Sequence, residues 1–286
     1  MSYDLSIALR ISPFLNSRHI YFASKYELVE TCFKSFITAL SGIDYELFTI
    51  LDGCPDCFEK MLRKNVEESR LKVIRTNKIG NNATFMLQIQ ILSNKASSDY
   101  VYFAEDDYFY VEHFKHLLEF IRKNRFIDFV SPYDHPDYYL RKDLHPYRII
   151  KLAYNNRIWK NVMSTTCTFL TKKEILRETC EILKSYARIG DYFMWYVLTR
   201  KISLIDFLKI VIAFHRRNIK TIAFHQQHLL KEAFLLKYLI KTPGTKYHLW
   251  VPEPTIATHM QKDCLSPGIN WNHLLSRKCN AKSMKQ

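Results

Sequence analysis

The sequence lacks a long uninterrupted apolar segment. The longest apolar patches, such as Leu204–Phe214, include Asp206 and Lys209 and are too short to cross a bilayer. The first residues, Met1–Arg10, contain neither a basic region nor a long apolar stretch, so we expect no signal peptide. Both absences favour a cytoplasmic protein.

Cysteine is sparse and scattered. The chain has 7 cysteines, an odd number, which disfavours a disulfide framework and fits a reducing compartment. Cys54 and Cys57 form a Cys-x-x-Cys pair, a spacing found in redox sites and in zinc half-sites. No second cysteine pair has a matching spacing. We therefore favour two loop cysteines without a chemical role.

The charge is strongly unbalanced. The chain has 42 Lys and Arg against 28 Asp and Glu, a formal net charge of +14 over 286 residues. This excess indicates an anionic partner, such as a nucleic acid, a nucleotide or a membrane surface. The hydrophobic fraction of 48% indicates a folded chain that buries a real core in one large or two small domains.

Short β-type runs alternate with segments of helical spacing over the first hundred residues. The predicted strands are Leu5–Ile11, Tyr45–Leu51, Leu71–Thr76 and Tyr100–Ala104. The predicted helices are Tyr26–Leu40, Glu59–Ser69 and one that opens at Gly80 and breaks at Ser97. This alternation is typical of a mostly parallel sheet covered by helices, which binds ligands at the carboxyl ends of its strands.

The pattern changes after residue 110. In chain order we expect a helix over Val111–Lys123, a strand over Phe126–Ser131, a loop over Pro132–Tyr139 and a β-type run over Val162–Leu170. The tetrad Thr171–Glu174 fits a capping box that starts a helix ending near Ala187. Asp191 then lies in a turn that opens a helix over Tyr192–Thr199.

Residues 200–241 are basic and helical in pattern. Within residues 203–220, apolar side chains group against Lys209, Arg216, Arg217 and Lys220. A basic amphipathic helix of this kind can lie on an anionic membrane, which would make the protein peripheral on the inner face. The alternative, which we favour, is a helix packed on the α/β domain with a solvated basic face.

Three consecutive carboxylates, Glu105–Asp107, lie within the aromatic stretch Tyr100–Tyr110. Like charges held together cost free energy unless something neutralises them. A strand that ends in such a triplet can hold a divalent cation, because Mg²⁺ and Mn²⁺ prefer oxygen ligands. In an extended segment Glu105 and Asp107 point the same way and can share one ligand. We expect Asp52, at the end of another predicted strand, to lie at the same crevice.

The order of these segments resembles that of glycosyltransferases with a GT-A fold, and of their family 2 in particular. The acidic triplet after a hydrophobic strand resembles their Asp-x-Asp motif. The strand ends at Arg10 and Asp52, and the segment Asn77–Ala83, fall where that family places its nucleotide-binding segments. The resemblance covers about residues 5–195. It implies a GT-A, Rossmann-like α/β fold with a mostly parallel central sheet, flanking helices and a helical C-terminal region.

The resemblance also implies a function and a set of residues. The function is metal-dependent, inverting transfer of a sugar from a nucleotide-sugar donor to a glycan or lipid-linked acceptor, with Mn²⁺ or Mg²⁺. Asp52 would contact the base, Asp107 would bind the metal, and Glu105 and Asp106 would lie near the ribose or the sugar. The nucleotide-sugar-binding residues are then Arg10, Asp52, Gly80, Asn81, Glu105 and Asp106.

The catalytic base and a second metal ligand follow from the same resemblance. The family's base is an acidic residue that opens a helix after a later strand, and the matching position here is Asp191, preceded by Gly190 instead of an acid. Asp134 or Asp137, in the loop after Ser131, is the rival base. Related enzymes often return a histidine from a C-terminal segment to the metal, which makes His259 the second candidate ligand.

We expect a catalytic domain over residues 1–199, with a nucleotide-binding half (about 1–110) and an acceptor half (about 111–199). A basic helical segment (200–248), a segment returning to the active site (249–275) and a disordered tail (276–286) would follow. One alternative is a nucleotidyltransferase acting on sugar phosphates, although the residues after Arg10 lack the glycine of a phosphate loop. The other is a basic nucleic-acid-binding protein, although here the aromatic residues surround acids, so we expect no nucleic acid.

Overall fold

The computed structural model describes residues 3–14, 21–142, 144–145, 147–201, 203–205, 207–209, 212, 234–241 and 246–275. The predicted tail (276–286) lies outside the described residues, as do Arg216, Arg217 and Lys220 of the basic segment.

Four parallel strands form the first half of the central sheet, in the order β3-β2-β1-β4. They are β1 (Leu5–Ile11), β2 (Tyr45–Asp52), β3 (Leu71–Thr76) and β4 (Tyr100–Glu105). β1 and β2 are buried along their whole length, as expected for strands covered on both faces. All four predicted strands are confirmed, each to within one residue.

The sheet continues from β4 through β9, β6, β10 and β8 to β7. β8 and β9 run against the other strands of this sheet, so it is mostly parallel in direction, as predicted. A separate antiparallel pair joins β5 to β11. The bounds are β5 (Tyr108–Tyr110), β6 (Phe129–Val130), β7 (Lys151–Tyr154), β8 (Arg157–Val162), β9 (Phe169–Lys172), β10 (Leu249–Glu253) and β11 (Ala257–His259).

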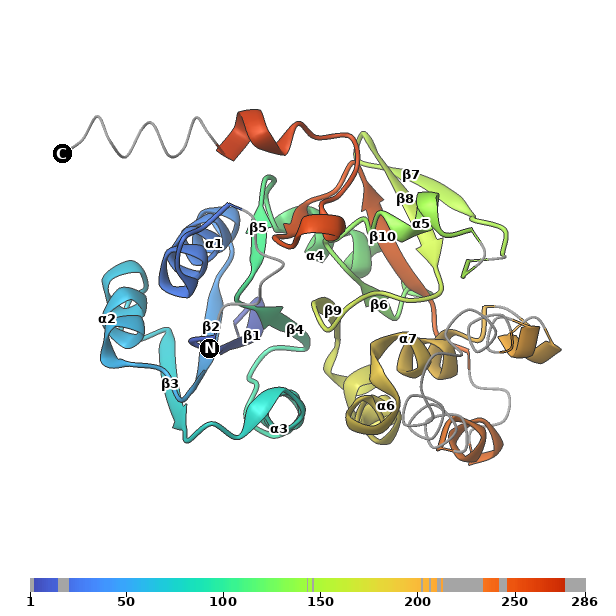
Figure 1. Ribbon diagram of the computed structural model, residues 1–286, viewed down its shortest axis with the longest axis horizontal. Helices are drawn as coiled ribbons and strands as arrows, with labels where there is room; N and C mark the ends of the chain where they lie inside the picture. The colour runs from blue at the N-terminus through green and yellow to red at the C-terminus, as the bar shows by residue number, and fades with distance from the viewer. Residues whose placement is uncertain are drawn as a thin grey trace.

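β10 lies in the middle of this second half, between β6 and β8. The predicted domain boundary at residue 199 would therefore divide the sheet, because the central strand β10 (Leu249–Glu253) comes after that residue. Figure 1 shows β10, in red, beside β8. Part of the predicted C-terminal segment thus belongs to the same sheet as β1–β4.

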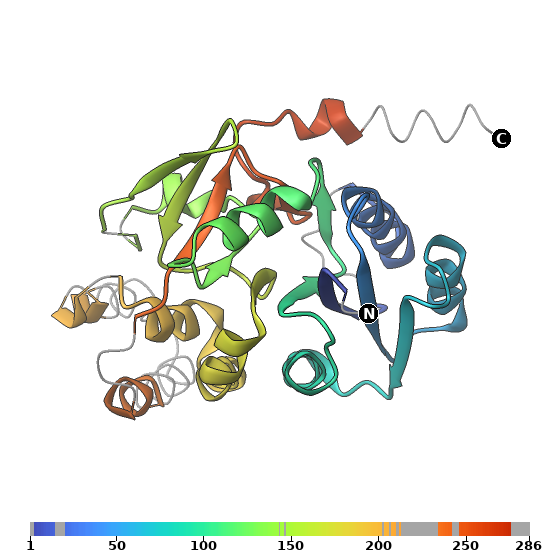
Figure 2. The ribbon, with the colours of Figure 1, turned by 180° about the vertical axis from the view of Figure 1, so that it is seen from behind.

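Helices cover both faces of the sheet (Figures 1 and 2). α1 (Lys25–Ala39), α2 (Asp56–Asn65) and α4 (Lys115–Lys123) pack with the β1 side chains Leu5, Ile7, Leu9 and Ile11 in one buried cluster. α3 (Gly80–Asn94), α6 (Lys173–Leu183) and α7 (Tyr186–Thr199) pack with Ala8, Val101 and Phe103 in the other. The alternation of β1 and β4 side chains between the two clusters is the period of two expected of strands. The described residues also form a short α5 (Asp137–Leu140), a 3₁₀ turn, η1 (Lys262–Cys264), and helical segments at residues 234–241 and 271–275.

Two predicted helices start at other residues than expected. The helix predicted over Val111–Lys123 begins at Lys115, because the amide of Val111 donates to the carbonyl of Ile256 (2.9 Å) and extends the β5–β11 pairing. The helix predicted over Glu59–Ser69 is α2, which begins at Asp56 and stops where Val66 is extended.

The predicted capping box at Thr171–Glu174 is wrong. Thr171 belongs to β9, and its hydroxyl donates to the carbonyl of Asp128 (2.7 Å) instead of capping α6. The β-type run predicted over Val162–Leu170 divides into the end of β8 and the start of β9. The strand predicted over Phe126–Ser131 shortens to Phe129–Val130.

The β7–β8 hairpin was not predicted. Its turn contains Asn155 and Asn156, with φ of 49° and 57°, the left-handed pair that Asn tolerates and that hairpins of this type require. The Asn-Asn dipeptide was the available sequence signal.

The described part of the basic segment packs on α7. Phe207 is buried and stacks on Tyr196 with 3.9 Å between ring centroids, and Arg188 lies 4.7 Å from the ring of Phe234. No helix within the described residues is both long enough and apolar enough to cross a membrane.

We expect Phe103→Ala to destabilise the protein strongly. Phe103 is fully buried, stacks on Phe169 at 4.5 Å and contacts Phe85 at 5.6 Å. Removing a buried ring leaves a cavity and costs about 3–5 kcal/mol. Urea unfolding measures the loss, with the exposed Leu140→Ala as a control that should change stability by less than about 0.5 kcal/mol. A loss below about 1 kcal/mol for Phe103→Ala would contradict the described packing.

Candidate active site

The carboxyl ends of β1, β2 and β4 meet at one edge of the sheet. In the parallel register Arg10 stands opposite Glu105, and Asp52 closes the neighbouring strand β2. These ends line a cleft of about 340 Å³. Its walls contain all six predicted nucleotide-sugar-binding residues together with Asp107; they are Arg10, Asp52, Gly80, Asn81, Glu105, Asp106 and Asp107.

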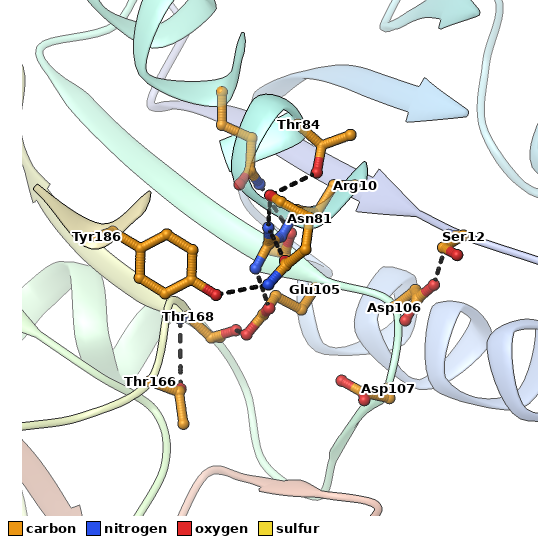
Figure 3. A network of polar contacts seen from close by, with 12 residues as sticks. Arg10, Ser12, Asn81, Thr84, Glu105, Asp106, Asp107, Thr166, Thr168 and Tyr186 are labelled. Atoms are coloured by element: carbon orange, nitrogen blue, oxygen red, sulfur yellow. Dashed lines mark hydrogen bonds and ion pairs between the residues drawn. The ribbon is translucent and has the colours of Figure 1, made fainter. Parts of the chain in front are cut away.

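Arg10 forms a buried ion pair with Glu105 in which Nη2 and Oε1 are 2.5 Å apart. Its other guanidinium nitrogen donates to the backbone and side-chain oxygens of Asn81 at 2.8 and 2.5 Å (Figure 3). The second oxygen of Glu105 accepts from the Thr168 hydroxyl at 3.2 Å. Burial alone would lower the pKa of Arg10, but the charge and hydrogen bond of Glu105, together with contributions from Cys167 and Tyr186, outweigh it and raise the pKa. The pair therefore fixes β1, β4 and the start of α3 relative to one another.

Asp52 holds the amino terminus of α3. Its carboxylate accepts from the amides of Ile79 (2.7 Å) and Gly80 (2.8 Å) and from the Thr76 hydroxyl (2.8 Å). Burial would raise the pKa of Asp52, but these donors outweigh it and lower the pKa. Gly80 has a φ of +87°, so the sharp approach to the helix needs a residue without a Cβ. Asp52 and α3 together shape one wall of the cleft.

Asp106 is the most enclosed member of the triplet. Oδ1 pairs with Nζ of Lys25 at 2.7 Å, and Oδ2 accepts from the amide of Ser12 at 2.9 Å. Burial raises the pKa of Asp106, against the pull of the Lys25 charge. Lys25 lies in the first turn of α1 and is itself buried. The sequence offered no signal for this lysine, because a buried partner for a carboxylate is decided by the fold.

Asp107 faces His259, with 3.0 Å between Oδ2 and Nε2. The β5–β11 pairing puts His259 opposite Tyr108, whose ring it stacks on at 5.0 Å. Burial would lower the pKa of His259, but the Asp107 charge and hydrogen bond raise it to about 10. The C-terminal segment thus returns to the acidic triplet through β11.

The three carboxylates therefore have three different cationic partners. Glu105 and Asp107 pair with different side chains, because β4 ends at Glu105 and the chain turns at Asp106 and Asp107 instead of continuing in extended form. Figure 3 shows Asp106 and Asp107 apart from the Arg10–Glu105 pair.

Asp191 follows a break in α7. Gly190 has non-helical angles (φ 77°, ψ 175°), and the side chain of Asp191 accepts from the amide of Tyr192 at 2.8 Å. Burial is the main cause that raises the pKa of Asp191; the Glu105 charge adds to this and His259 opposes it. Asp191 is thus within electrostatic reach of the triplet and of its histidine.

Two contacts tie the first turn of α7 to the start of α3. The side-chain amide of Asn81 donates to the Tyr186 hydroxyl at 2.7 Å (Figure 3), and the side-chain amide of Asn82 donates to the Ala187 carbonyl at 3.4 Å. Since Asn81 also accepts from Arg10, the network that joins β1 to β4 also positions the helix that carries Asp191. No local sequence pattern marks Tyr186 as part of this network.

Asp134 lies in a separate buried network. Its carboxylate pairs with Lys160 at 2.7 Å and accepts from the Tyr139 hydroxyl at 2.6 Å. Burial raises the pKa of Asp134 against the pull of Lys160. Asp137 begins α5 and lies 3.8 Å from His135. The carboxylate of Asp134 is thus already engaged by the buried lysine, whereas Asp191 accepts from a backbone amide.

The Cys-x-x-Cys pair shows no redox geometry. Cys54 is buried, and burial raises its pKa to about 12, whereas Cys57 is exposed. A redox cysteine needs a depressed pKa. Cys54 instead donates to the carbonyl of Ile11 at 3.4 Å and packs beneath the cleft.

We expect Asp52→Asn to lower stability by about 1–2 kcal/mol at pH 7, the usual cost of a lost helix cap. Folding lowers the pKa of Asp52, so its contribution is complete above the unfolded-state pKa of about 4 and is lost as pH falls through the folded-state pKa. The difference from wild type should therefore shrink below that pH in urea unfolding. Asp99→Asn, at an exposed position, is the control. A pH-independent difference would contradict the capping role.

Comparison with known proteins gives distant likenesses. No protein-family model and no curated protein matches the sequence. TarS 1-349 from S. aureus matches with a TM-score of 0.45 and 14% identity over 84% of this chain and 72% of that one. CMP:2-keto-3-deoxy-manno-octonic acid synthetase complexed with CTP gives 0.41 and 10% over 99% of both chains. The galactosyltransferase LgtC with donor and acceptor sugar analogs gives 0.38 and 10% over 72% and 70%. We draw no function from likenesses at this level.

Proposed function

We propose that this chain is a glycosyltransferase that moves a sugar from a nucleotide-sugar donor to a glycan or lipid-linked acceptor. The observation that carries the proposal is the meeting of Asp52 and the triplet Glu105–Asp107 in one cleft at the strand ends, with Asp107 facing His259. Strand-end clefts of α/β sheets are where such folds bind nucleotides. We propose that Asp52, Gly80 and Asn81 form the nucleotide side of the cleft.

We propose Asp107 and His259 as the protein ligands of Mn²⁺ or Mg²⁺. The described residues contain no group of three or more His, Cys, Asp or Glu that could hold a metal. Two protein ligands fit a cation that takes its other ligands from phosphate oxygens and water, as Mg²⁺ usually does. The carboxylate also suits Mn²⁺, as does the imidazole once it loses the proton that pairs it with Asp107. When bound, the cation would neutralise charge on the departing nucleoside diphosphate.

We propose Asp191 as the general base of an inverting transfer. Its carboxylate would accept the proton of the acceptor hydroxyl as that oxygen bonds to the anomeric carbon and the bond to the diphosphate oxygen breaks. The raised pKa suits this role, because a base works best when its pKa lies near the working pH. The oxocarbenium-like centre of this reaction is the one that glycosidases also stabilise with carboxylates. Asp134 is paired with the buried Lys160 and is therefore the weaker candidate for the general base.

We retain peripheral association with an anionic membrane as a proposal for the acceptor side. The described part of the basic segment exposes several large apolar side chains, among them Leu204, Ile205 and Ile212. These would suit a lipid-linked acceptor held at a membrane surface.

We expect metal-dependent nucleotide binding to require Asp107. In a thermal-shift panel of nucleoside diphosphates and nucleotide sugars with and without Mn²⁺, a ligand at a hundred times its Kd should raise the Tm by about 5 °C. One nucleotide should do so in the presence of the metal, and Asp107→Asn should abolish the shift while the exposed Asp99→Asn keeps it.

An equal rise in Tm for Asp107→Asn and wild type would contradict the metal assignment. A Tm that no nucleotide raises would contradict the glycosyltransferase proposal. If product masses show that a nucleotide is transferred onto a sugar phosphate, the protein is a nucleotidyltransferase and not a glycosyltransferase.

We expect Asp191→Asn to keep donor binding and to lose turnover by about 10² or more, the usual scale for a removed general base. Release of nucleoside diphosphate with an acceptor mixture measures turnover, and the thermal shift measures binding. Asp134→Asn is the comparison: it should lower stability, because Lys160 is left buried without its carboxylate. Near-normal turnover in Asp191→Asn would move the base to Asp134 or Asp137.

A further inference from the structure

A second cavity of about 350 Å³ lies at the opposite edge of the sheet from the nucleotide cleft. β4 and β6 both run antiparallel to β9, and β10 is parallel to β6, so β4, β6 and β10 share one direction. The cleft lies at the carboxyl end of β4, whereas this cavity lies beside the first residues of β10 and the end of α7. The amide of Tyr247 donates to the carbonyl of Leu198 (2.9 Å) and joins these two segments.

One wall of the cavity is apolar and partly open. Phe126, Ile150, Leu152 and Trp250 contribute to it, and Phe126 packs edge-on against Trp250 with 6.0 Å between ring centroids. Phe126 and Ile150 are more than half exposed, at 52% and 56%. These side chains offer apolar surface that a ligand in the cavity would cover.

Two lysines, Lys201 and Lys246, line the same cavity. Lys201 is half-buried, and its burial together with the charge of Lys246 lowers its pKa to about 8. Its ammonium lies 5.1 Å from the centre of the Tyr147 ring. Among the residues that the structure describes, no carboxylate forms an ion pair with Lys201 or Lys246, whereas the neighbouring Lys151 pairs with Glu253 at 2.9 Å.

Two like charges at a partly buried site cost free energy in the absence of a counter-charge. An anion that enters between them removes that cost and gains hydrogen bonds to charged donors. A phosphate monoester carries a charge of about −1.5 to −2 at pH 7, which matches two ammonium groups.

We propose that this cavity binds a phosphate monoester with an apolar body, its phosphate between Lys201 and Lys246 and its body on Phe126 and Ile150. The site is separate from the nucleotide cleft and does not depend on the function proposed for it. A soluble phosphate ester and the head group of an anionic lipid share this chemistry.

Phenyl phosphate is the probe, and titration calorimetry on the full chain at low salt is the measurement. The double variant Lys201→Met, Lys246→Met keeps the apolar stems and removes both charges. The double variant Lys60→Met, Lys64→Met makes the same charge change at exposed positions on α2 and is the matched control. Asp107→Asn reports on the nucleotide cleft.

We expect phenyl phosphate to bind the wild type, the control and Asp107→Asn equally, and to bind the Lys201, Lys246 variant at least about tenfold more weakly, the scale of lost charged hydrogen bonds. Inorganic phosphate and benzyl alcohol, which each carry half of the chemistry, should both bind more weakly than phenyl phosphate. The melting temperature of the variant should not fall, because a repulsion is removed.

No binding of phenyl phosphate to the wild type, or equal binding to the Lys201, Lys246 variant, would overturn the proposal. Inorganic phosphate binding as tightly as phenyl phosphate would overturn the role of the apolar wall. Flotation with phosphatidylcholine vesicles containing phosphatidic acid distinguishes the two sources. If the wild type floats and the Lys201, Lys246 variant does not, the ligand is a lipid head group. If the wild type does not float, the ligand is a soluble ester.

Discussion

Three adjacent carboxylates at one edge of the sheet are neutralised by three separate cations, and this constraint organises the elements around them. Glu105, Asp106 and Asp107 would repel one another if they shared an environment, and each instead faces a cation from a different element. The cations come from the end of β1, the start of α1 and the end of β11. Because the partners are far apart in sequence, satisfying the triplet requires the fold to bring these elements to one edge of the sheet.

The same constraint explains how the cleft and the candidate base are held together. Arg10 is fixed by Glu105, and Asn81 bridges Arg10 to Tyr186 at the start of α7. The break at Gly190 then directs the chain so that Asp191 lies within electrostatic reach of Glu105 and His259. Ion pairs buried in this way stabilise little by themselves, but breaking one leaves an uncompensated charge and is costly. The network therefore serves to position groups more than to add stability.

The sequence predicted those features that local composition decides. The four parallel strands were predicted to within one residue, because continuous apolar runs such as Tyr100–Ala104 bounded by polar residues are typical of buried strands. The placement of the triplet and Asp52 at one edge followed from the parallel order. The failures depend on tertiary contacts: Thr171 bonds to Asp128 across the sheet instead of capping α6, and Lys25 has no local pattern that marks it as the partner of Asp106.

The central claim is that the Asp107–His259 pair is a cation site open to a nucleotide. Anomalous scattering from crystals grown with Mn²⁺ and the nucleoside diphosphate that binds most tightly tests it most directly. We expect one strong manganese peak, coordinated by the carboxylate of Asp107, by Nε2 of His259 and by diphosphate oxygens. A peak elsewhere, or a bound nucleotide with the Asp107–His259 ion pair intact and no metal beside it, would show that this pair is not the cation site.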